Sequence, residues 1–459
     1  MKKFYITAGI VCIIGTFSMC HKAGIFPDEG YDERLSGGST TVFDESSKAF
    51  SNMMAGLSAR DERVHEIGDQ TFEQIFVAPP ARVAAGLGPI YNNVSCVNCH
   101  RNDGEGIPTA GFANSGLLMR ISQPGMDDHG GPLAIPGFGT QLQDQSVFGA
   151  LPEAAIDISY TDSTVNYPDG SSLLLRRPSY NLVNPYLPLA GVVMLSPRLA
   201  PPVVGMGLLE NIPETTILSF VDEGDKNGDG ITGKANYVYN PYTRQTELGR
   251  FGLKANTSSL LLQVATAYQQ DMGVTSYVQP LESAAGQEQM KVLQGDVQPE
   301  LPDTLLNYVT FYVRTLAVPA RRNITDPDVR QGALLFNQIN CSGCHRPTIQ
   351  TAVNVTLLQV SNQRIHPYTD LLLHDMGNGL ADNRPDYLAS GREWRTQPLW
   401  GIGLLQKTTG TAYYLHDGRG RTLEEAILWH DGEARNAKQQ FMQLSKADRD
   451  RIISFLQSL

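Results

Sequence analysis

Apolar side chains recur at helical spacing in several stretches of the chain, most clearly in its C-terminal half. Residues 302–316 and 325–340 each place an apolar stripe on one face, and residues 445–459 open with a capping-box-like serine before another such stripe. In residues 257–270 a threonine can cap a helix that buries leucines. Between residues 121 and 240, proline and glycine predict mainly loops. We therefore expect a mostly α-helical fold with large loop-rich insertions in the N-terminal part.

The N-terminus has the pattern of an export signal. Lys2 and Lys3 precede an apolar run too short to span a membrane, so residues 1–19 are predicted to be a signal peptide. Cys20 ends the run, where a lipoprotein signal places its acylated cysteine. The Phe-Ser-Met before it matches that signal poorly, so acylation and ordinary cleavage both stay open. We expect export to the periplasm or cell envelope, with residues 20–46 as a flexible tether.

The rest of the chain is long enough for two or three domains. A Val-Pro-Ala-Arg-Arg segment after the helix at 302–316 predicts an interdomain crossing near residue 320. The expected division is an N-terminal domain over residues 47–320 and a C-terminal domain over residues 321–459.

The net charge of −11 argues against a nucleic-acid partner, as does the lack of a long Lys/Arg cluster. An acidic surface usually serves solubility, and it also suits a basic electron donor.

Two Cys-x-x-Cys-His motifs carry the chemistry: Cys96, Cys99 and His100 form the first, and Cys341, Cys344 and His345 the second. This spacing is the attachment signature of a c-type haem, in which both thiols bind the vinyl groups and the histidine is the proximal iron ligand. The other two of the six cysteines lie in the leader, so no structural disulfide is implied. We predict two covalent haems, with zinc or disulfides as the alternative.

A short acidic segment resembles the first half of a calcium loop. Asp225, Asn227 and Asp229 place oxygen ligands at alternate positions before a glycine, but Asn236 stands where a bidentate glutamate is expected. Bound calcium and a polar turn both stay open.

The string YLHDGR followed by TLEEA resembles the bacterial di-haem cytochrome c peroxidase superfamily. More closely, LGPIYNNVSCVNCH, NGDGITGKANYV, GRFGLKA, YVRTLAVPARR, IHPYTDLLLHDMG and GREWRTQPLWGIG resemble the family called di-haem oxidoreductase, putative peroxidase, once labelled thiol oxidoreductases. The resemblance covers about residues 80–459. It implies two mostly α-helical cytochrome c-like domains with one haem each. It also implies that electrons enter at the C-terminal haem and that the N-terminal haem is the reactive one.

The resemblance also suggests iron ligands. The distal residue of the C-terminal haem comes eight positions after the threonine of TLEEA, which is His430 here, where better-known branches have Met or Tyr. Its rivals are ligation by Met376 and a capped surface histidine with no iron. His366, His374 and His416 are more typical of structural or haem-propionate partners. For the N-terminal haem the open candidates are His129, Met119, Met126 and Met272.

A faint internal repeat suggests an acid–base group. Aligning Arg198 with Arg419 brings Glu210 within one position of His430, on the distal side of the first haem, where the peroxidases keep a catalytic glutamate. Glu214 is the competitor, and an ordinary ion pair of Glu210 is the alternative.

The inter-haem electron route stays open. Trp394, Trp400 and Trp429 all fall in the C-terminal part, whereas the peroxidases carry their inter-haem tryptophan in the N-terminal domain. That region offers Tyr180 and Tyr186 here.

The expected function is reduction of hydrogen peroxide with electrons from a small donor protein, a cytochrome c or cupredoxin. The alternatives are oxidative modification of a partner protein and a non-enzymatic role in electron transfer or iron handling.

Overall fold

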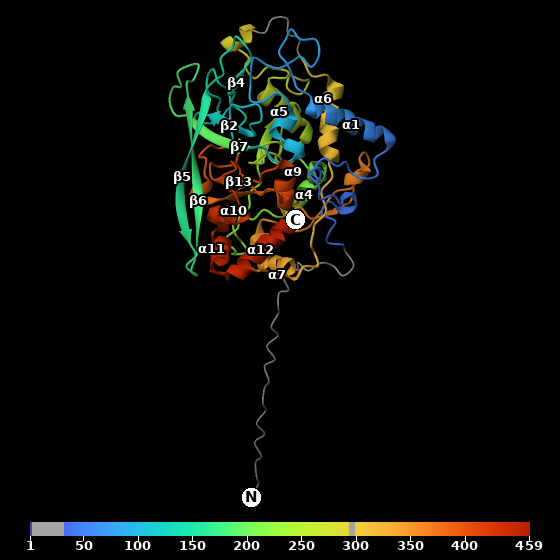
Figure 1. The fold of residues 1–459 in the computed structure, drawn as a ribbon, viewed down its shortest axis with the longest axis vertical. Helices are drawn as coiled ribbons and strands as arrows, with labels where there is room; N and C mark the ends of the chain where they lie inside the picture. Colours follow the sequence, from blue (N-terminus) through green and yellow to red (C-terminus); the bar gives the residue numbers. More distant parts are fainter. Residues whose placement is uncertain (2–31, 293–298) are drawn as a thin grey trace. The chain divides into compact units, whose positions relative to one another are not determined.

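Two helix pairs of the same construction support the two Cys-x-x-Cys-His motifs (Figure 1). Helix α1 (Ala59–Glu73) packs against α6 (Asp303–Thr315), and α7 (Pro327–Gln338) packs against α12 (Lys446–Ser458). Gly68 and Gly332 lie at the two crossings, where an added Cβ would clash with the main-chain carbonyls of Tyr308 and Arg451. Glycine is therefore what lets each pair of helix backbones approach so closely.

The computed structural model describes Met1, residues 32–292 and residues 299–459. The predicted signal peptide, Cys20 and the first part of the predicted tether lie outside these residues. Within the described ranges, no helix is both long and apolar enough to cross a membrane. Residues 32–459 form one unit by their internal contacts.

Shorter helices complete the arrangement around the motifs. The first motif begins α2 (Cys96–Cys99), and the second begins a 3-10 turn over Cys341–Gly343. Two further helices, α5 (Leu260–Met272) and α10 (Leu423–Trp429), face the motifs. The remaining α-helices are α3 (Met206–Glu210), α4 (Glu214–Leu218), α8 (Gly377–Leu380), α9 (Leu405–Thr409) and α11 (Arg435–Gln443).

Antiparallel strands fill much of the segment for which the sequence predicts loops. A three-stranded sheet has the order β3-β2-β7, and β5 and β6 pair along their whole length as a long hairpin (Figure 1). These strands are β2 (Leu117–Ser122), β3 (Gln141–Leu142), β5 (Ala155–Asn166), β6 (Ser172–Val183) and β7 (Met194–Leu199). Small pairs join β1 (Ile90–Tyr91) to β4 (Gln145–Ser146), β8 (Tyr237–Asn240) to β9 (Gln245–Leu248), β10 (Ile349–Gln350) to β11 (Arg364–Ile365), and β12 (Leu373–Asp375) to β13 (Glu393–Arg395).

The expectation of a mostly α-helical protein made of two cytochrome c-like domains is therefore wrong. Only 30% of the structure is helical and 19% is strand, spread over several small sheets. The difference has a physical cause. In β5 apolar and polar residues alternate, as in Ile156, Asp157 and Ile158, which is typical of a strand. The prolines and glycines around this stretch favour a loop instead. Gly170 sits at positive φ in the turn between β5 and β6, as hairpin turns require.

The predicted interdomain crossing is buried. Leu316, Ala317 and Val318 have no exposed surface and belong to the main core. Val42 pairs with the crossing, since its N–H donates to the Val318 carbonyl and its own carbonyl accepts from Ala320. Residues 33–46, predicted as part of the tether, thus pack on this crossing, and the division into domains at residue 320 stays a prediction.

Candidate cofactor site

One cavity of about 670 Å³ is lined by both Cys-x-x-Cys-His motifs. Cys96, Cys99 and His100 contribute to its wall from α2 and the residue after it, and Cys341, Cys344 and His345 contribute from the 3-10 turn and the residues after it. The structure thus brings together six candidate residues that the sequence separates by more than half of its length.

Both motif histidines are held in the tautomer that suits a metal ligand. Nδ1 of His100 lies 2.8 Å from the Pro201 carbonyl, and Nδ1 of His345 lies 2.9 Å from the Tyr368 carbonyl. A carbonyl can only accept, so Nδ1 carries the proton and the lone pair is on Nε2. Burial lowers the pKa of both imidazoles, that of His345 to about 4, which keeps them neutral.

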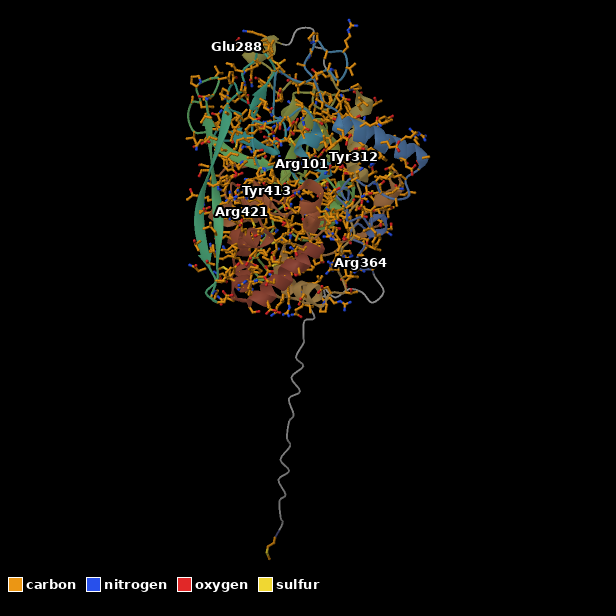
Figure 2. All side chains as sticks on the ribbon, in the orientation of Figure 1. Arg101, Glu288, Tyr312, Arg364, Tyr413 and Arg421 are labelled. Carbon is orange, nitrogen blue, oxygen red and sulfur yellow. The ribbon has the colours of Figure 1, made fainter. Side chains whose placement is uncertain are left out.

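An aromatic ring from the helix pair supports each histidine. Phe72 lies 6.1 Å from His100 and 5.4 Å from Tyr312 between ring centroids (Tyr312 is labelled in Figure 2). At the second motif, Phe336 lies 6.2 Å from His345 and 5.1 Å from Phe455. Both motif histidines therefore pack against a phenylalanine that contacts a second aromatic ring.

All four motif cysteines are free and half-buried. Burial raises the pKa of Cys96 and of Cys341 to about 12. Since no disulfide consumes them, each pair can form the two thioether bonds that a c-type haem needs.

His430 lines the same cavity as His345 and follows the last residue of α10. Its Nδ1 lies 2.7 Å from the Ala426 carbonyl, which leaves Nε2 with a lone pair. The two rings are close enough for His430 to lower the pKa of His345. Met376 also lines the cavity. The geometry favours His430 over a surface role, and its ligation of iron stays a prediction.

Of the four ligand candidates for the first haem, one lines the cavity, Met272. His129 stacks on Tyr239 at 3.7 Å in an exposed loop. Met119 is a fully buried residue of β2, and Met126 is 59% exposed.

Glu210 does not line the haem cavity. Its carboxylate pairs with Arg314 at 2.5 Å, and it also accepts the N–H of Leu260 at 2.9 Å, at the start of α5. Glu214 is an exposed partner of Arg250. The contacts of Glu210 are those of the ordinary ion pair that the sequence leaves open. The repeat alignment missed this because it did not include α5.

Asp271 lines the cavity close to the thiols of the first motif and accepts a hydrogen bond from Gln141 at 2.6 Å, and a second carboxylate of the wall is that of Glu105. It is 7% exposed and accepts the main-chain N–H of Tyr413 at 2.8 Å (Tyr413 is labelled in Figure 2). Burial raises its pKa to about 8. Its position five residues after His100 was the available sequence signal.

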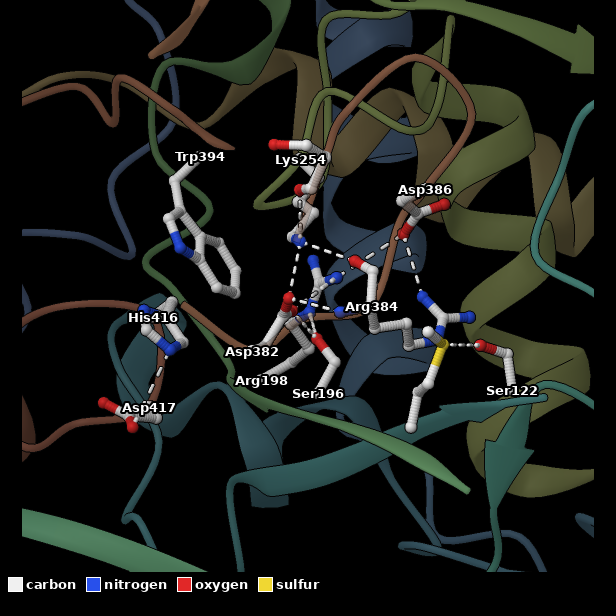
Figure 3. A network of polar contacts seen from close by, with 12 residues as sticks. Ser122, Ser196, Arg198, Lys254, Asp382, Arg384, Asp386, Trp394, His416 and Asp417 are labelled. Atoms are coloured by element: carbon white, nitrogen blue, oxygen red, sulfur yellow. Dashed lines mark hydrogen bonds and ion pairs between the residues drawn. The ribbon is translucent and has the colours of Figure 1, made fainter. Parts of the chain in front are cut away.

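A buried charge cluster reaches the cavity wall through Arg198, Arg384 and Asp386 (Figure 3). Lys254 binds Asp382 at 2.8 Å, and Arg198 and Arg384 both approach Asp386, at 3.4 and 3.3 Å. Burial lowers the pKa of Lys254 to about 8 and that of Arg198 to about 10.

The cluster carries a net positive charge. Its three cations face two carboxylates, and Nε of Arg384, a residue of the cavity wall, is buried with no hydrogen-bond partner among the described residues. A buried cation needs an anionic partner. This wall therefore fits the carboxylates that haem carries at its edge. Lys254 lies in the GRFGLKA motif, so the sequence of this motif could have indicated the charge cluster.

His374 lies between two carboxylates behind the second motif. Its Nε2 is 2.9 Å from Asp370 and its Nδ1 is 2.8 Å from Glu433. Cys344, Asp370 and His374 are close enough together to suggest a metal site. Since both ring nitrogens are already engaged by carboxylates, a clamped structural histidine accounts for the geometry better than zinc. His374 and His416 both line the cavity, and His416 stacks on Trp394 at 3.7 Å.

The predicted calcium loop is an exposed polar turn. Asp225 accepts the N–H of Gly230, Asn227 that of Asp229, and Asp229 that of Ile231. Among the residues that the structure describes, the acidic groups of this loop do not gather into a metal-ligand cluster. Calcium binding here stays a prediction.

The tyrosines suggested for the electron route lie off the cavity wall. Tyr180 donates to Asp417 at 3.1 Å from the β5–β6 hairpin, and Tyr186 packs against Phe138. Trp394 and Trp400 both line the cavity.

Comparison with known proteins identifies the family. The profile of the family described as "Di-haem oxidoreductase, putative peroxidase" matches residues 31–459, nearly the whole chain, so the chain belongs to that family. No curated protein matches the sequence. Among solved structures, hydrazine synthase of Kuenenia stuttgartiensis, pressurised with xenon, is 17% identical with a TM-score of 0.23, over 35% of this chain and 56% of that one. The overlap thus spans little more than half of the hydrazine synthase chain.

Proposed function

We propose that this member of the di-haem oxidoreductase family carries one covalent haem at each motif and reduces hydrogen peroxide with electrons from a small redox protein. The observation that carries the proposal is the cavity lined by both motifs, in which His100 and His345 have the same tautomer. Family membership supports the class of reaction.

The haem-binding residues follow from the wall of this cavity. Cys96, Cys99 and His100 would hold one haem, and Cys341, Cys344 and His345 the other. A bound haem supplies an iron that exchanges single electrons and can bind peroxide where a ligand position is open. Each peroxide takes up two electrons and two protons and gives two waters.

His430 gives the two haem sites different roles. With His345 and His430 both holding it, a haem at the C-terminal site would have no free ligand position and would be suited to receive and store an electron. Peroxide would then react at the N-terminal site.

Glu105 is our candidate for the proton-handling group at that site. With its pKa raised to about 8, its carboxyl holds a proton near neutral pH and can release it to a departing oxygen. Glu210, engaged by Arg314 outside the cavity, is the comparison.

The predicted signal peptide supports export with Cys20 as a lipid anchor, and c-type haem attachment fits that location. The net charge of −11 suits a basic donor such as a cytochrome c or cupredoxin. We also propose that Asp225, Asn227 and Asp229 bind a calcium ion. Calcium sites of exported proteins can be weak, because calcium is plentiful outside the cytoplasm.

The test is stopped-flow reoxidation of the fully reduced protein by hydrogen peroxide. We expect fast reoxidation in wild type and a loss of about 10²–10⁴ in Glu105→Gln, with Glu210→Gln close to wild type. If wild type ignores peroxide, the peroxidase proposal falls, and modification of a partner protein or a carrier role takes its place. If Glu210→Gln alone is slow, the proton-handling role returns to Glu210.

A further inference from the structure

Helices α5 and α10 share four positions, counted from their N-caps, at which both line the cavity. Ser259 caps α5 by accepting the N–H of Leu262 at 3.3 Å, and Thr422 caps α10 by accepting that of Glu425 at 3.1 Å. The four shared positions are the first, fourth, fifth and eighth after the cap, namely Leu260, Gln263, Val264 and Ala267 in α5 and Leu423, Ala426, Ile427 and His430 in α10. This spacing is that of one helix face. Helix α5 also lines the cavity with Leu262, Thr266, Tyr268, Gln270, Asp271 and Met272.

The equivalence places Ala267 where α10 has His430. A methyl group cannot coordinate iron, whereas the imidazole of His430 has a free Nε2. We infer that the haem of the first motif has no side-chain ligand opposite His100, and that Gln263 hydrogen-bonds the small molecule that binds there. This inference rests on the proposed haem at each motif and identifies the residues that shape the reactive site.

Gln263 is suited to this role by its place and its free polar group. It lies one turn before Ala267 on the same helix face, with apolar Leu260 and Val264 beside it. Its Oε1 is buried and has no hydrogen-bond partner within the described part of the chain. Buried amides are rarely left unpaired, so the position indicates a partner that enters the cavity.

Met272, the candidate ligand that also lines the cavity, occupies a different position on α5. It ends α5 five residues after Ala267, more than a full turn farther along and rotated by about 140° about the helix axis. Its side chain is 2% exposed within the main core. It therefore acts as a packing residue.

The ligand class follows from the site. A space beside a methyl group and one amide accepts a small molecule with a hydrogen-bonding oxygen or nitrogen. Hydrogen peroxide is such a molecule, and azide is a stable probe of the same size class.

The test uses the ferric protein with both haems, followed by visible and electron paramagnetic resonance spectra during azide titration. Wild type should show one high-spin haem that binds one azide. Ala267→His should convert that haem to low spin and abolish azide binding, while the control Ala267→Leu should leave it high-spin. Gln263→Leu should keep the high-spin signal and weaken azide binding by roughly threefold to tenfold, the loss of one hydrogen bond.

Four results would overturn the inference. Two low-spin haems in wild type, or a high-spin signal that Ala267→His does not change, would remove Ala267 from the site. A new high-spin haem in Met272→Leu would make Met272 the ligand. Unchanged azide affinity in Gln263→Leu, with a shifted haem potential, would make Gln263 a propionate partner. A protein that binds azide as expected but ignores peroxide would sink the proposed function alone.

Discussion

His430 and His345 line one cavity from different elements, and each presents its Nε2 because a main-chain carbonyl holds its Nδ1. The N–H of His430 also caps α10 by donating to Ile427, which fixes the backbone that carries the ring. Two neutral imidazoles prepared in this way are what a six-coordinate haem iron requires.

His430→Ala should therefore convert the haem of the second motif from low spin to high spin and leave the other haem unchanged. The spectra of the ferric protein at equal haem content are the measurement, with Met376→Ala as the matched variant. A change in Met376→Ala and none in His430→Ala would give the ligand role to Met376.

The two helix crossings should be equally sensitive to a single methyl group. Gly68→Ala and Gly332→Ala both push a Cβ into a main-chain carbonyl that cannot move away, so each should lower the free energy of unfolding by about 1–3 kcal/mol. Urea unfolding measures this. Gly224→Ala is the control, since its added Cβ meets only a flexible lysine side chain at 3.8 Å. Equal stability of all three variants would mean that the crossings are not close-packed.

The His65 ring should make stability depend on pH. Its Nδ1 donates to Thr315 at 2.8 Å, since that hydroxyl donates its own proton to Phe311. Burial lowers its pKa to about 4, so below pH 6.5 the unfolded chain binds a proton that the folded chain refuses. Stability should thus fall by roughly 2–3 kcal/mol as pH drops from about 6.5 to about 4. His65→Gln should flatten this part of the stability curve. An equally steep curve in that variant would assign the slope to other groups.

Lys254 should be needed mainly for its charge. Its Nζ contacts Asp382 at 2.8 Å and two main-chain carbonyls, and its side chain has no exposed surface. Lys254→Met leaves Asp382 a buried carboxylate with weakened partners and should cost about 3–5 kcal/mol by urea unfolding. Adding Asp382→Asn should restore part of this loss. No recovery in the double variant would show that the loss comes from packing.

The motifs were readable from sequence because their chemistry is local. Five consecutive residues specify the haem attachment, and the count from Thr422 reached His430 because helix α10 keeps its spacing. The family was likewise identified from contiguous strings, as the match over residues 31–459 confirms.

Features that depend on distant contacts were not readable in this way. The strands β5 and β6 were missed because their stability comes from pairing with each other. Glu210 looked catalytic until α5 and Arg314 supplied its partners. The pattern Gly-x-x-x-Phe-x-Gln-Ile occurs twice, beginning at Gly68 and at Gly332. This repeat could have predicted both helix crossings from the sequence.

The central claim is that each motif binds one haem covalently, and the most direct measurement is a haem count on the purified mature protein. Intact mass and haem-stained denaturing gels should show two haems in wild type. One should remain in Cys96→Ala/Cys99→Ala, one in Cys341→Ala/Cys344→Ala, and none when all four cysteines are replaced. Haem that is absent from wild type, or that stays bound through denaturation without these cysteines, would contradict the account.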